Sequence, residues 1–467
     1  MMRRPMTHRT TILAAVLIGA LATSGCSTVS NLNPFGKKDK GPAELAGEGQ
    51  RISIIPADQR LEPAEALKGV DFSLPPAEVV AAWPLPGGTP EQVVGNVAAG
   101  ANVSVAWRKN FGQGQKRGRY VTAPPVAADG KVFVMDADGR VVAVDAASGS
   151  QLWRTGTNPG DNKRDKLGFG GGMAYADGKL YVSSGYREVL QMDAKTGAIG
   201  WRTKTPEAIH GAPTVSAGRV FAISLDNTLM TFDAATGTAS WTYQALTETA
   251  RILSASSPAV SGDTVVAAFG SGELVALRAS NGNDLWNEAL SRASRTSALS
   301  EIRDIPGRPV IYQGDVFAVS HSGVFAATDL RTGQARWSLP VVGVSTPLPA
   351  GDVVYVVSKT GDVICASREN GQIYWIRNLN EGFKAKKKGG ILGVGGQRQN
   401  RPVWSGPLLA GDKLLIVGQT GQLVALNAKT GEITKRVELK GASTLEPIAA
   451  GDTVYVVTQD ADLIAIR

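Results

Sequence analysis

The stretch VVAVDAASGSQLW, Val141 to Trp153, holds a glycine followed four residues later by a tryptophan. Close variants of this stretch recur along the chain, and such self-similarity predicts one structural unit built many times over. The whole unit runs from Ala123 to Trp153 and carries two alternating apolar segments, bounded by turn residues, before the motif. Each copy is therefore expected to form three or four β-strands.

The glycine and tryptophan pair is interrupted only at the two ends of the series. A seventh copy ends at Gly431 and has Lys435 in place of the tryptophan, and an eighth begins at Leu445 and stops before a corresponding strand. The missing strand is present near the other end of the chain as VSVAWRKN, Val103 to Asn110. The complete glycine and tryptophan pairs are Gly149 and Trp153, Gly197 and Trp201, Gly237 and Trp241, Gly282 and Trp286, Gly333 and Trp337, and Gly371 and Trp375.

The spacing of the copies, 38 to 60 residues, fits one four-stranded blade each. A strand from the N-terminal side placed beside three strands from the C-terminus would close a ring, and closure leaves no unpaired sheet edge in the ring. We therefore expect an all-β, eight-bladed β-propeller over residues 101–467. A linear β-solenoid would not need the two chain ends to complement one another.

The motif has a physical explanation that involves no ligand. An aspartate stands four residues before the glycine in four copies, where its carboxylate can accept turn N–H bonds while the glycine takes a positive φ. These aspartates are Asp145, Asp193, Asp233 and Asp329. A tryptophan buried between blades hides roughly 150–250 Å² and can also donate its indole N–H. The predicted blade-docking residues are Trp107, Trp153, Trp201, Trp241, Trp286, Trp337 and Trp375.

The first 25 residues are typical of a secretion signal. A basic start, MMRRPMTHR, precedes the apolar run TILAAVLIGALA, Thr11 to Ala22, which is too short to span a bilayer. Small residues then lead to Cys26, a pattern that resembles a bacterial lipobox, although Thr23 stands where that pattern usually has leucine. The resemblance implies a lipid on Cys26, and Ser27 after it implies sorting to the outer membrane. An ordinary cleaved signal is the alternative.

Residues 26–100 are rich in proline, glycine and charge, which predicts an extended tether. Trp83 and the run from Leu74 to Pro76 are expected to dock onto the folded body. The formal net charge is only +8, and the one dense basic run is Lys384, Lys386, Lys387 and Lys388. Nucleic-acid binding, which needs a concentrated basic face with aromatic residues, is not expected.

Catalytic signatures are missing from the sequence. His210 and His321 are the only histidines after the predicted signal, and neither stands in a nucleophile or metal motif. Both are expected to be ordinary strand or loop residues, and Cys365, in DVICAS, is expected to be a buried strand residue. The glycine cluster from Gly168 to Gly172 lacks the context of a phosphate loop and predicts a turn leading into a strand.

The pattern A-x-D-x-x-x-G-x-x-x-W, Ala143 to Trp153, resembles the tryptophan-docking motif of quinoprotein-like β-propellers. That resemblance covers about residues 101–467 and specifies the fold far more strongly than the function. A pyrroloquinoline-quinone-dependent periplasmic dehydrogenase is the enzymatic alternative. It would call for a carboxylate and amide ion site, an aspartate base and usually an adjacent cysteine pair. Cys365 is the only cysteine after residue 26, so the pair cannot form, and we expect neither a cofactor nor a metal site.

A lipobox followed by such a propeller resembles the BamB family of bacterial outer-membrane lipoproteins. The segments Arg51 to Pro63 and Leu74 to Gly88 are similar to those of α-proteobacterial members. The resemblance implies a non-enzymatic scaffold, lipid-anchored to the outer membrane and facing the periplasm. It also implies binding to the POTRA domains of BamA and to other assembly-complex subunits, and help in assembling unfolded outer-membrane proteins. A propeller that binds peptidoglycan or another periplasmic partner is a third possibility.

In that family two neighbouring interblade loops contact the partner. They correspond here to TARILSASSP, Thr249 to Pro258, and SEIRDIPGRP, Ser300 to Pro309. Exposed aliphatic side chains beside arginine are typical of interface anchors, whereas plain solvated connections are the alternative. The insertion Gly382 to Pro402 is either a solvated loop or, through its lysines, a contact with anionic headgroups or an acidic partner. The predicted partner-binding residues are Arg251, Ile252, Leu253 and Asp304.

Overall fold

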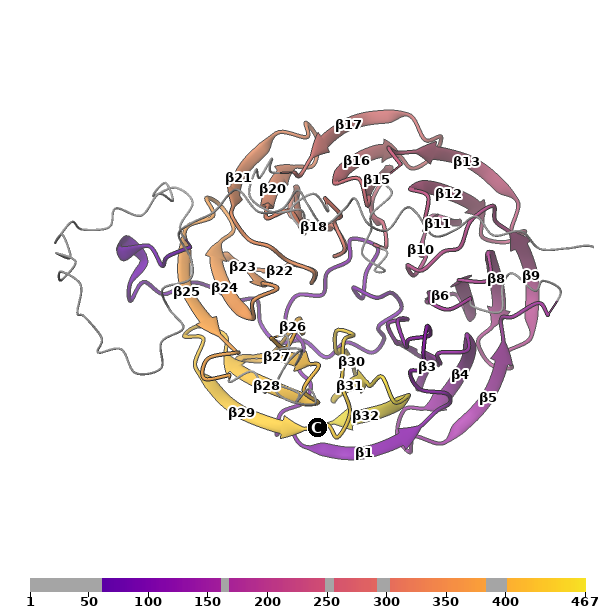
Figure 1. Cartoon of the computed structure of the whole chain (residues 1–467), viewed down its shortest axis with the longest axis horizontal. Coiled ribbons are helices and arrows are strands. Elements are labelled where there is room, and N and C mark those ends of the chain that lie inside the picture. Colours follow the sequence, from indigo (N-terminus) through magenta and orange to yellow (C-terminus); the bar gives the residue numbers. More distant parts are fainter. Residues whose placement is uncertain (1–60, 161–167, 248–255, 292–302, 384–400) are drawn as a thin grey trace, which may run out of the picture. The chain divides into compact units, whose positions relative to one another are not determined.

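The computed structural model describes residues 61–160, 168–247, 256–291, 303–383 and 401–467, all within one compact unit. Apart from a 3-10 helix at Glu65–Leu67, its regular elements are β-strands. They form eight four-stranded antiparallel sheets set around a common axis, which is the predicted eight-bladed β-propeller (Figure 1). Within those ranges no helix has the length and apolarity needed to cross a bilayer.

Each blade has an inner, a second, a third and an outer strand. The inner strands are β2 (Val126–Ala128), β6 (Gly171–Ala176), β10 (Thr214–Ser216), β14 (Ala259–Ser261), β18 (Val310–Tyr312), β22 (Leu348–Ala350), β26 (Trp404–Ala410) and β30 (Ile448–Ala450). The second strands are β3 (Lys131–Met135), β7 (Lys179–Ser184), β11 (Arg219–Ile223), β15 (Thr264–Ala268), β19 (Asp315–Val319), β23 (Val353–Val357), β27 (Lys413–Gly418) and β31 (Thr453–Val457).

The third and outer strands complete the blades. The third strands are β4 (Arg140–Asp145), β8 (Glu188–Asp193), β12 (Thr228–Asp233), β16 (Glu273–Arg278), β20 (Phe325–Asp329), β24 (Asp362–Ser367), β28 (Gln422–Asn427) and β32 (Asp462–Ile466). The outer strands are β5 (Gln151–Gly156), β9 (Ile199–Lys204), β13 (Ala239–Gln244), β17 (Asp284–Ala289), β21 (Ala335–Leu339), β25 (Ile373–Asn378), β29 (Ile433–Glu438) and, in the eighth blade, β1 (Val105–Asn110).

The eighth blade closes the ring as predicted. Its strand order is β1-β32-β31-β30, so one N-terminal strand completes a sheet made by the C-terminus. Trp107 on β1 faces Ala465 on β32, in the register that Trp153 and Ala143 take in the first blade. Figure 1 shows β1 beside the C-terminal strands. Joining the two ends in this way leaves no gap between the first and last blades.

The middle strands of a blade are buried on both faces because a neighbouring blade covers each face. β4, with the sequence RVVAVD, has four consecutive buried residues, whereas the outer strand β5 is half-buried at only two positions and exposed at the rest. An uninterrupted apolar run is what a strand covered on both sides requires. The core of the propeller therefore consists of apolar layers between blades, and Cys365 belongs to one of them, as predicted.

Alternating strand direction gives the propeller two unlike ends. The interblade connections lead into the inner strands, so they lie at the same end as the turns between second and third strands. We call this end the connection face. The turns between inner and second strands lie at the opposite end, the strap face. The predicted partner loops join β13 to β14 and β17 to β18, so they belong to the connection face.

The aspartate turns are built as predicted. Asp193 Oδ1 accepts the N–H groups of Lys195 at 3.1 Å and Thr196 at 2.9 Å, and the Thr196 hydroxyl at 2.9 Å, while Gly197 has φ 75°. Asp145, Asp233 and Asp329 make the corresponding bonds in their own turns. The Thr196 side chain, followed by Lys179, lowers the pKa of Asp193 to about 2. The ionised carboxylate is thus the form that the folded turn holds.

We predict that Asp193→Ala lowers the melting temperature at pH 7. The pKa of Asp193 is lower in the folded chain than in the unfolded one, so its contribution is present above about pH 4 and is lost as the pH falls towards 2. Thermal unfolding at several pH values should show the deficit shrinking over that range. Asp193→Asn is the control, because Asn427 caps the same turn in the seventh blade. A deficit in Asp193→Ala that does not change with pH would contradict this account.

A half-buried acid lies between the fourth and fifth blades. Glu288, on β17, accepts a hydrogen bond from the Thr328 hydroxyl on β20 at 2.7 Å, and burial raises the pKa of Glu288. A raised pKa in the folded state means that stability falls as the pH rises through the folded value. We predict that Glu288→Gln raises the melting temperature at pH 8, with a gain that vanishes towards pH 4. Glu65→Gln, at an exposed site, should change nothing, and a loss of stability in Glu288→Gln at pH 8 would refute the prediction.

Residues 61–100, which we call the strap, begin with a mostly exposed stretch beside β25 and lie on the propeller from Phe72 onwards. Trp83 is 5% exposed and donates its indole N–H to the Pro86 carbonyl at 3.0 Å, so the predicted docking of Trp83 is confirmed. Phe72, Leu85 and Val97 are buried as well. The first sixty residues, with the apolar run and Cys26, lie outside the described residues.

The strap bonds to all eight blades. Trp83 forms an antiparallel bridge with Ala127 on β2, and Val97 forms a parallel bridge with Ala410 on β26. Carbonyls and side chains of other strap residues bond to the remaining six blades, mostly at the inner strands. These bonds reach Tyr175, Thr214, Val260, Ile311, Asp352 and Gly451. The strap therefore crosses the strap face around the axis and ties the blades together there.

Candidate functional site

The seven motif tryptophans lie between blades, away from the axis. Each indole ring lies on the turn glycine of the next blade, and a Cβ on that glycine would come within 2.9 Å of the ring. Five indole N–H groups donate to a backbone carbonyl of the next blade, that of the residue directly after its third strand. Trp286, for example, donates to the Leu330 carbonyl at 2.7 Å. Beside Trp107 and Trp375, the corresponding carbonyl instead accepts a hydrogen bond from a tyrosine hydroxyl, that of Tyr455 and of Tyr355 respectively. These contacts join blade to blade.

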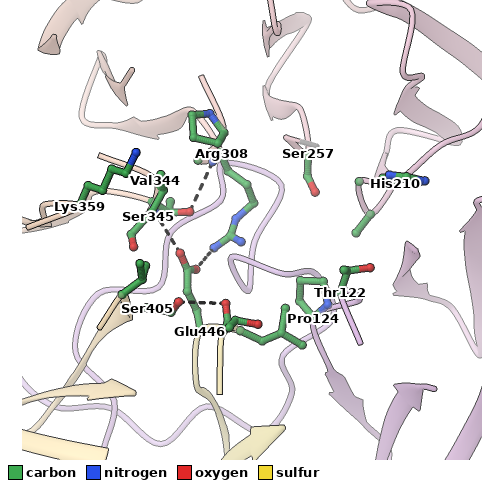
Figure 2. Close-up of a pocket in the computed structure, with 18 of the residues that line it drawn as sticks. Thr122, Pro124, His210, Ser257, Arg308, Val344, Ser345, Lys359, Ser405 and Glu446 are labelled. Carbon is green, nitrogen blue, oxygen red and sulfur yellow. Dashed lines mark hydrogen bonds and ion pairs between the residues drawn. The ribbon is translucent and has the colours of Figure 1, made fainter. Parts of the chain in front are cut away.

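A cavity of about 330 Å³ lies on the axis at the connection face (Figure 2). Its wall is formed mainly by the last residues of interblade connections, among them Ser257 before β14 and Arg308 before β18. Its exposed lining residues, Lys359 and Gln419, lie in turns between second and third strands. The cavity therefore opens towards the connection face, on which the predicted partner loops lie.

An ion pair crosses the inner end of this cavity. Arg308 pairs with Glu446 from the connection before β30, and the Thr346 N–H donates to the other Glu446 oxygen at 3.0 Å. The two charged side chains are only 12% and 21% exposed. Behind the pair, a space of about 30 Å³ is lined by Arg308, Glu446 and strap residues, including Trp83 and Gln92. The ion pair and, behind it, the strap thus form the floor of the cavity.

A lysine and two histidines lie at or beside the rim of the cavity. Lys359 Nζ donates to His321 Nε2 at 2.8 Å, and His210 lines the cavity with its ring 4.7 Å from that of Phe169. Both histidines lie in loops, in agreement with the sequence prediction. Glu446 is the one carboxylate that lines the cavity among the described residues, and Arg308 already neutralises it.

The two predicted partner loops meet at their bases. The Ser256 hydroxyl, at the end of the first loop, donates to the Gly307 carbonyl in the second at 3.2 Å. Arg251, Ile252 and Leu253 lie outside the described residues, as do the lysines from 384 to 388. The described bases of both loops form part of the cavity wall.

Asp304, the predicted partner-binding residue of the second loop, is buried. It is 2% exposed, and its carbonyl accepts the His321 N–H at 2.9 Å. The Asp304 side chain is thus buried at the base of the loop, and its partner-binding role stays a prediction. The prediction for Asp304 rests on the family resemblance, and Ile305, also buried, shows that this part of the loop turns inwards.

The described residues do not fit a quinone with its metal ion. Within the described ranges no three His, Cys, Asp or Glu side chains come together closely enough to hold a metal. Cys365 lies inside β24, where burial raises the pKa of its thiol. The cavity thus lacks the carboxylate set that the enzymatic alternative requires.

The family model described as outer membrane protein assembly factor BamB matches residues 91–163, 137–377 and 390–467, well over half of the chain. The chain belongs to the BamB family. A BamB of Alkalilimnicola ehrlichii is 29% identical over 374 residues, covering 80% of this chain and 90% of the relative. One from Burkholderia pseudomallei is 26% identical over 369 residues, covering 78% and 88%. The strap up to residue 90 precedes the matched ranges.

Solved structures agree with the fold. The crystal structure of BamB from Moraxella catarrhalis superposes with a TM-score of 0.63 at 18% identity, covering 78% of this chain and 98% of that one. A quinohemoprotein alcohol dehydrogenase from Comamonas testosteroni gives 0.62 at 16% identity, covering 81% and 77%. At such identities the likeness concerns the fold alone. It therefore does not separate BamB from the dehydrogenases, whereas the family match does.

Proposed function

We propose that the chain is a non-enzymatic scaffold in outer-membrane protein assembly. The observation that carries the proposal is the BamB family match over most of the propeller. Its finer form is that the connection face binds the POTRA domains of BamA through the two neighbouring loops, while a lipid on Cys26 holds the chain at the outer membrane. The α-proteobacterial affinity of the tether stays a prediction.

The loop bases support this form of the proposal. The Ser256 to Gly307 hydrogen bond fixes the two loops to one another, and the rigid inner strands β14 and β18 follow them directly. Anchors presented from a fixed base lose little conformational freedom on binding. Arg251, Ile252 and Leu253 remain the candidate anchors, and Asp304 remains a predicted partner-binding residue.

Deleting the gene tests the proposal. We expect the amount of folded β-barrel protein in the outer membrane to fall, and the wild-type chain to restore it. A variant with Ala at 251, 252 and 253 should restore it poorly. Leu152→Ser is the matched control, because Leu152 is an aliphatic residue that is 49% exposed on the outer strand β5, far along the chain from both loops. Unchanged β-barrel content after deletion would refute the assembly role.

A further inference from the structure

We propose that the axial cavity binds one acidic side chain of an extended peptide segment that enters from the connection face. The inference goes beyond the assembly role, since it concerns a pocket rather than the loops and holds whichever protein supplies the segment. A volume of about 330 Å³ is at the lower end of the range for ligand pockets, enough for one or two residues of a peptide.

Some polar groups that line the cavity and can donate hydrogen bonds have no acceptor among the described residues. Two buried polar atoms of its lining, Arg308 Nε and Thr122 Oγ1, have no hydrogen-bond partner among the described residues. A buried polar group without a partner is costly, so such groups are normally satisfied by other protein groups or by ordered water, and a ligand in the cavity could take the place of that water. Lys359 adds an exposed ammonium group that donates one hydrogen bond to His321. Figure 2 shows Lys359 and Thr122 on opposite sides of the cavity.

The charge balance favours a carboxylate. Glu446 is already occupied on both oxygens, by Arg308 and by the Thr346 N–H. Lys359 is then the one cationic side chain of the described lining without a carboxylate partner there, and one positive charge matches one carboxylate. Apolar lining residues, Pro124, Val344, Val403 and Leu445, suit the carbon atoms of a peptide.

The floor of the cavity determines how the segment can bind. The Arg308 and Glu446 pair and the strap close the strap-face end, so a chain cannot be threaded through the propeller. A side chain can therefore only enter and leave by the same opening. The pocket is suited to one residue projecting from a surface, which is the geometry of an anchor side chain.

The experiment uses the purified full-length chain in detergent and two blocked tripeptides, acetyl-Ala-Asp-Ala-amide and its Asn counterpart. Binding is followed by ligand-observed NMR. We expect the Asp peptide to bind at least tenfold more tightly than the Asn peptide. Lys359→Gln should weaken the Asp peptide at least fivefold and leave the Asn peptide unchanged, and Thr122→Val should weaken the Asp peptide. Lys195→Gln, at an exposed lysine in an outer turn, is the matched control.

Three results would overturn the proposal. They are equal binding of the two peptides, equal binding to Lys359→Gln and Lys195→Gln, or acetate binding as tightly as the Asp peptide. The last result would show a site for free small anions. Melting curves check that each variant is folded. Arg308 is left unchanged because its removal would leave the Glu446 carboxylate without its ion-pair partner. None of these results bears on the assembly role, which the gene deletion tests separately.

Discussion

Replacement of Trp286 by alanine is expected to lower the free energy of unfolding by about 3–5 kcal/mol, the range for removing a large aromatic from a core. Trp286 is 9% exposed, lies on Gly333 of the next blade and donates its indole N–H to the Leu330 carbonyl at 2.7 Å. Its loss removes a layer of contact between the fourth and fifth blades and leaves a carbonyl without its donor. Chemical denaturation followed by tryptophan-independent far-UV signal measures the effect.

Leu285→Ala is the control for this substitution. Leu285 precedes Trp286 on β17 and is 41% exposed, so its truncation should change stability by only about 0.5 kcal/mol. If the two variants lose similar stability, the tryptophan is not the joint between these blades. Gly333→Ala offers a reciprocal test, because its Cβ would lie 2.7 Å from the Trp286 ring at a residue with φ 72°.

Replacement of Trp83 by alanine should have a comparable effect, about 3–5 kcal/mol, although Trp83 lies in the strap. The ring is 5% exposed and packs in the apolar cluster that joins the strap to the first, seventh and eighth blades. Its backbone bridges Ala127, so losing the ring frees a segment bonded to every blade. We expect lower stability together with faster amide exchange in the inner strands.

Two variants in the same segment calibrate that measurement. Trp83→Phe should cost less than Trp83→Ala, since it keeps an aromatic ring and loses the N–H bond to the Pro86 carbonyl. Val79→Ala should cost almost nothing, because Val79 is 71% exposed. A small effect of Trp83→Ala would show that the strap is only loosely attached.

Much of the propeller could be predicted because its determinants are local and repeated. The aspartate, glycine and tryptophan of one motif lie within eleven residues in the printed sequence, and each copy repeats the same turn and bulge. Ring closure could be predicted because Trp107 is a motif residue without a preceding copy. In the strap only the docking of Trp83 could be predicted. Its path could not, because the segment has no periodicity and its backbone bonds go to strand ends that only the closed ring brings together.

The axial cavity was missed for a related physical reason. Thr122, Arg308, Lys359 and Glu446 come from four different blades or connections, and no sequence spacing relates them. They differ from the residues at equivalent places in the other copies, so the repeat gives no signal for them. The burial of Asp304 could not be predicted, because loop position in the sequence does not determine which way a side chain points.

The central claim, that the connection face binds an assembly partner, is tested most directly by photo-crosslinking in cells from positions 252 and 303. Arg303 is exposed at the described end of the second loop, and Gln151, exposed on β5, serves as the control position. The account predicts that the loop positions capture BamA and that position 151 does not. Capture of an unrelated periplasmic protein from both loop positions, or of BamA from position 151 alone, would contradict it.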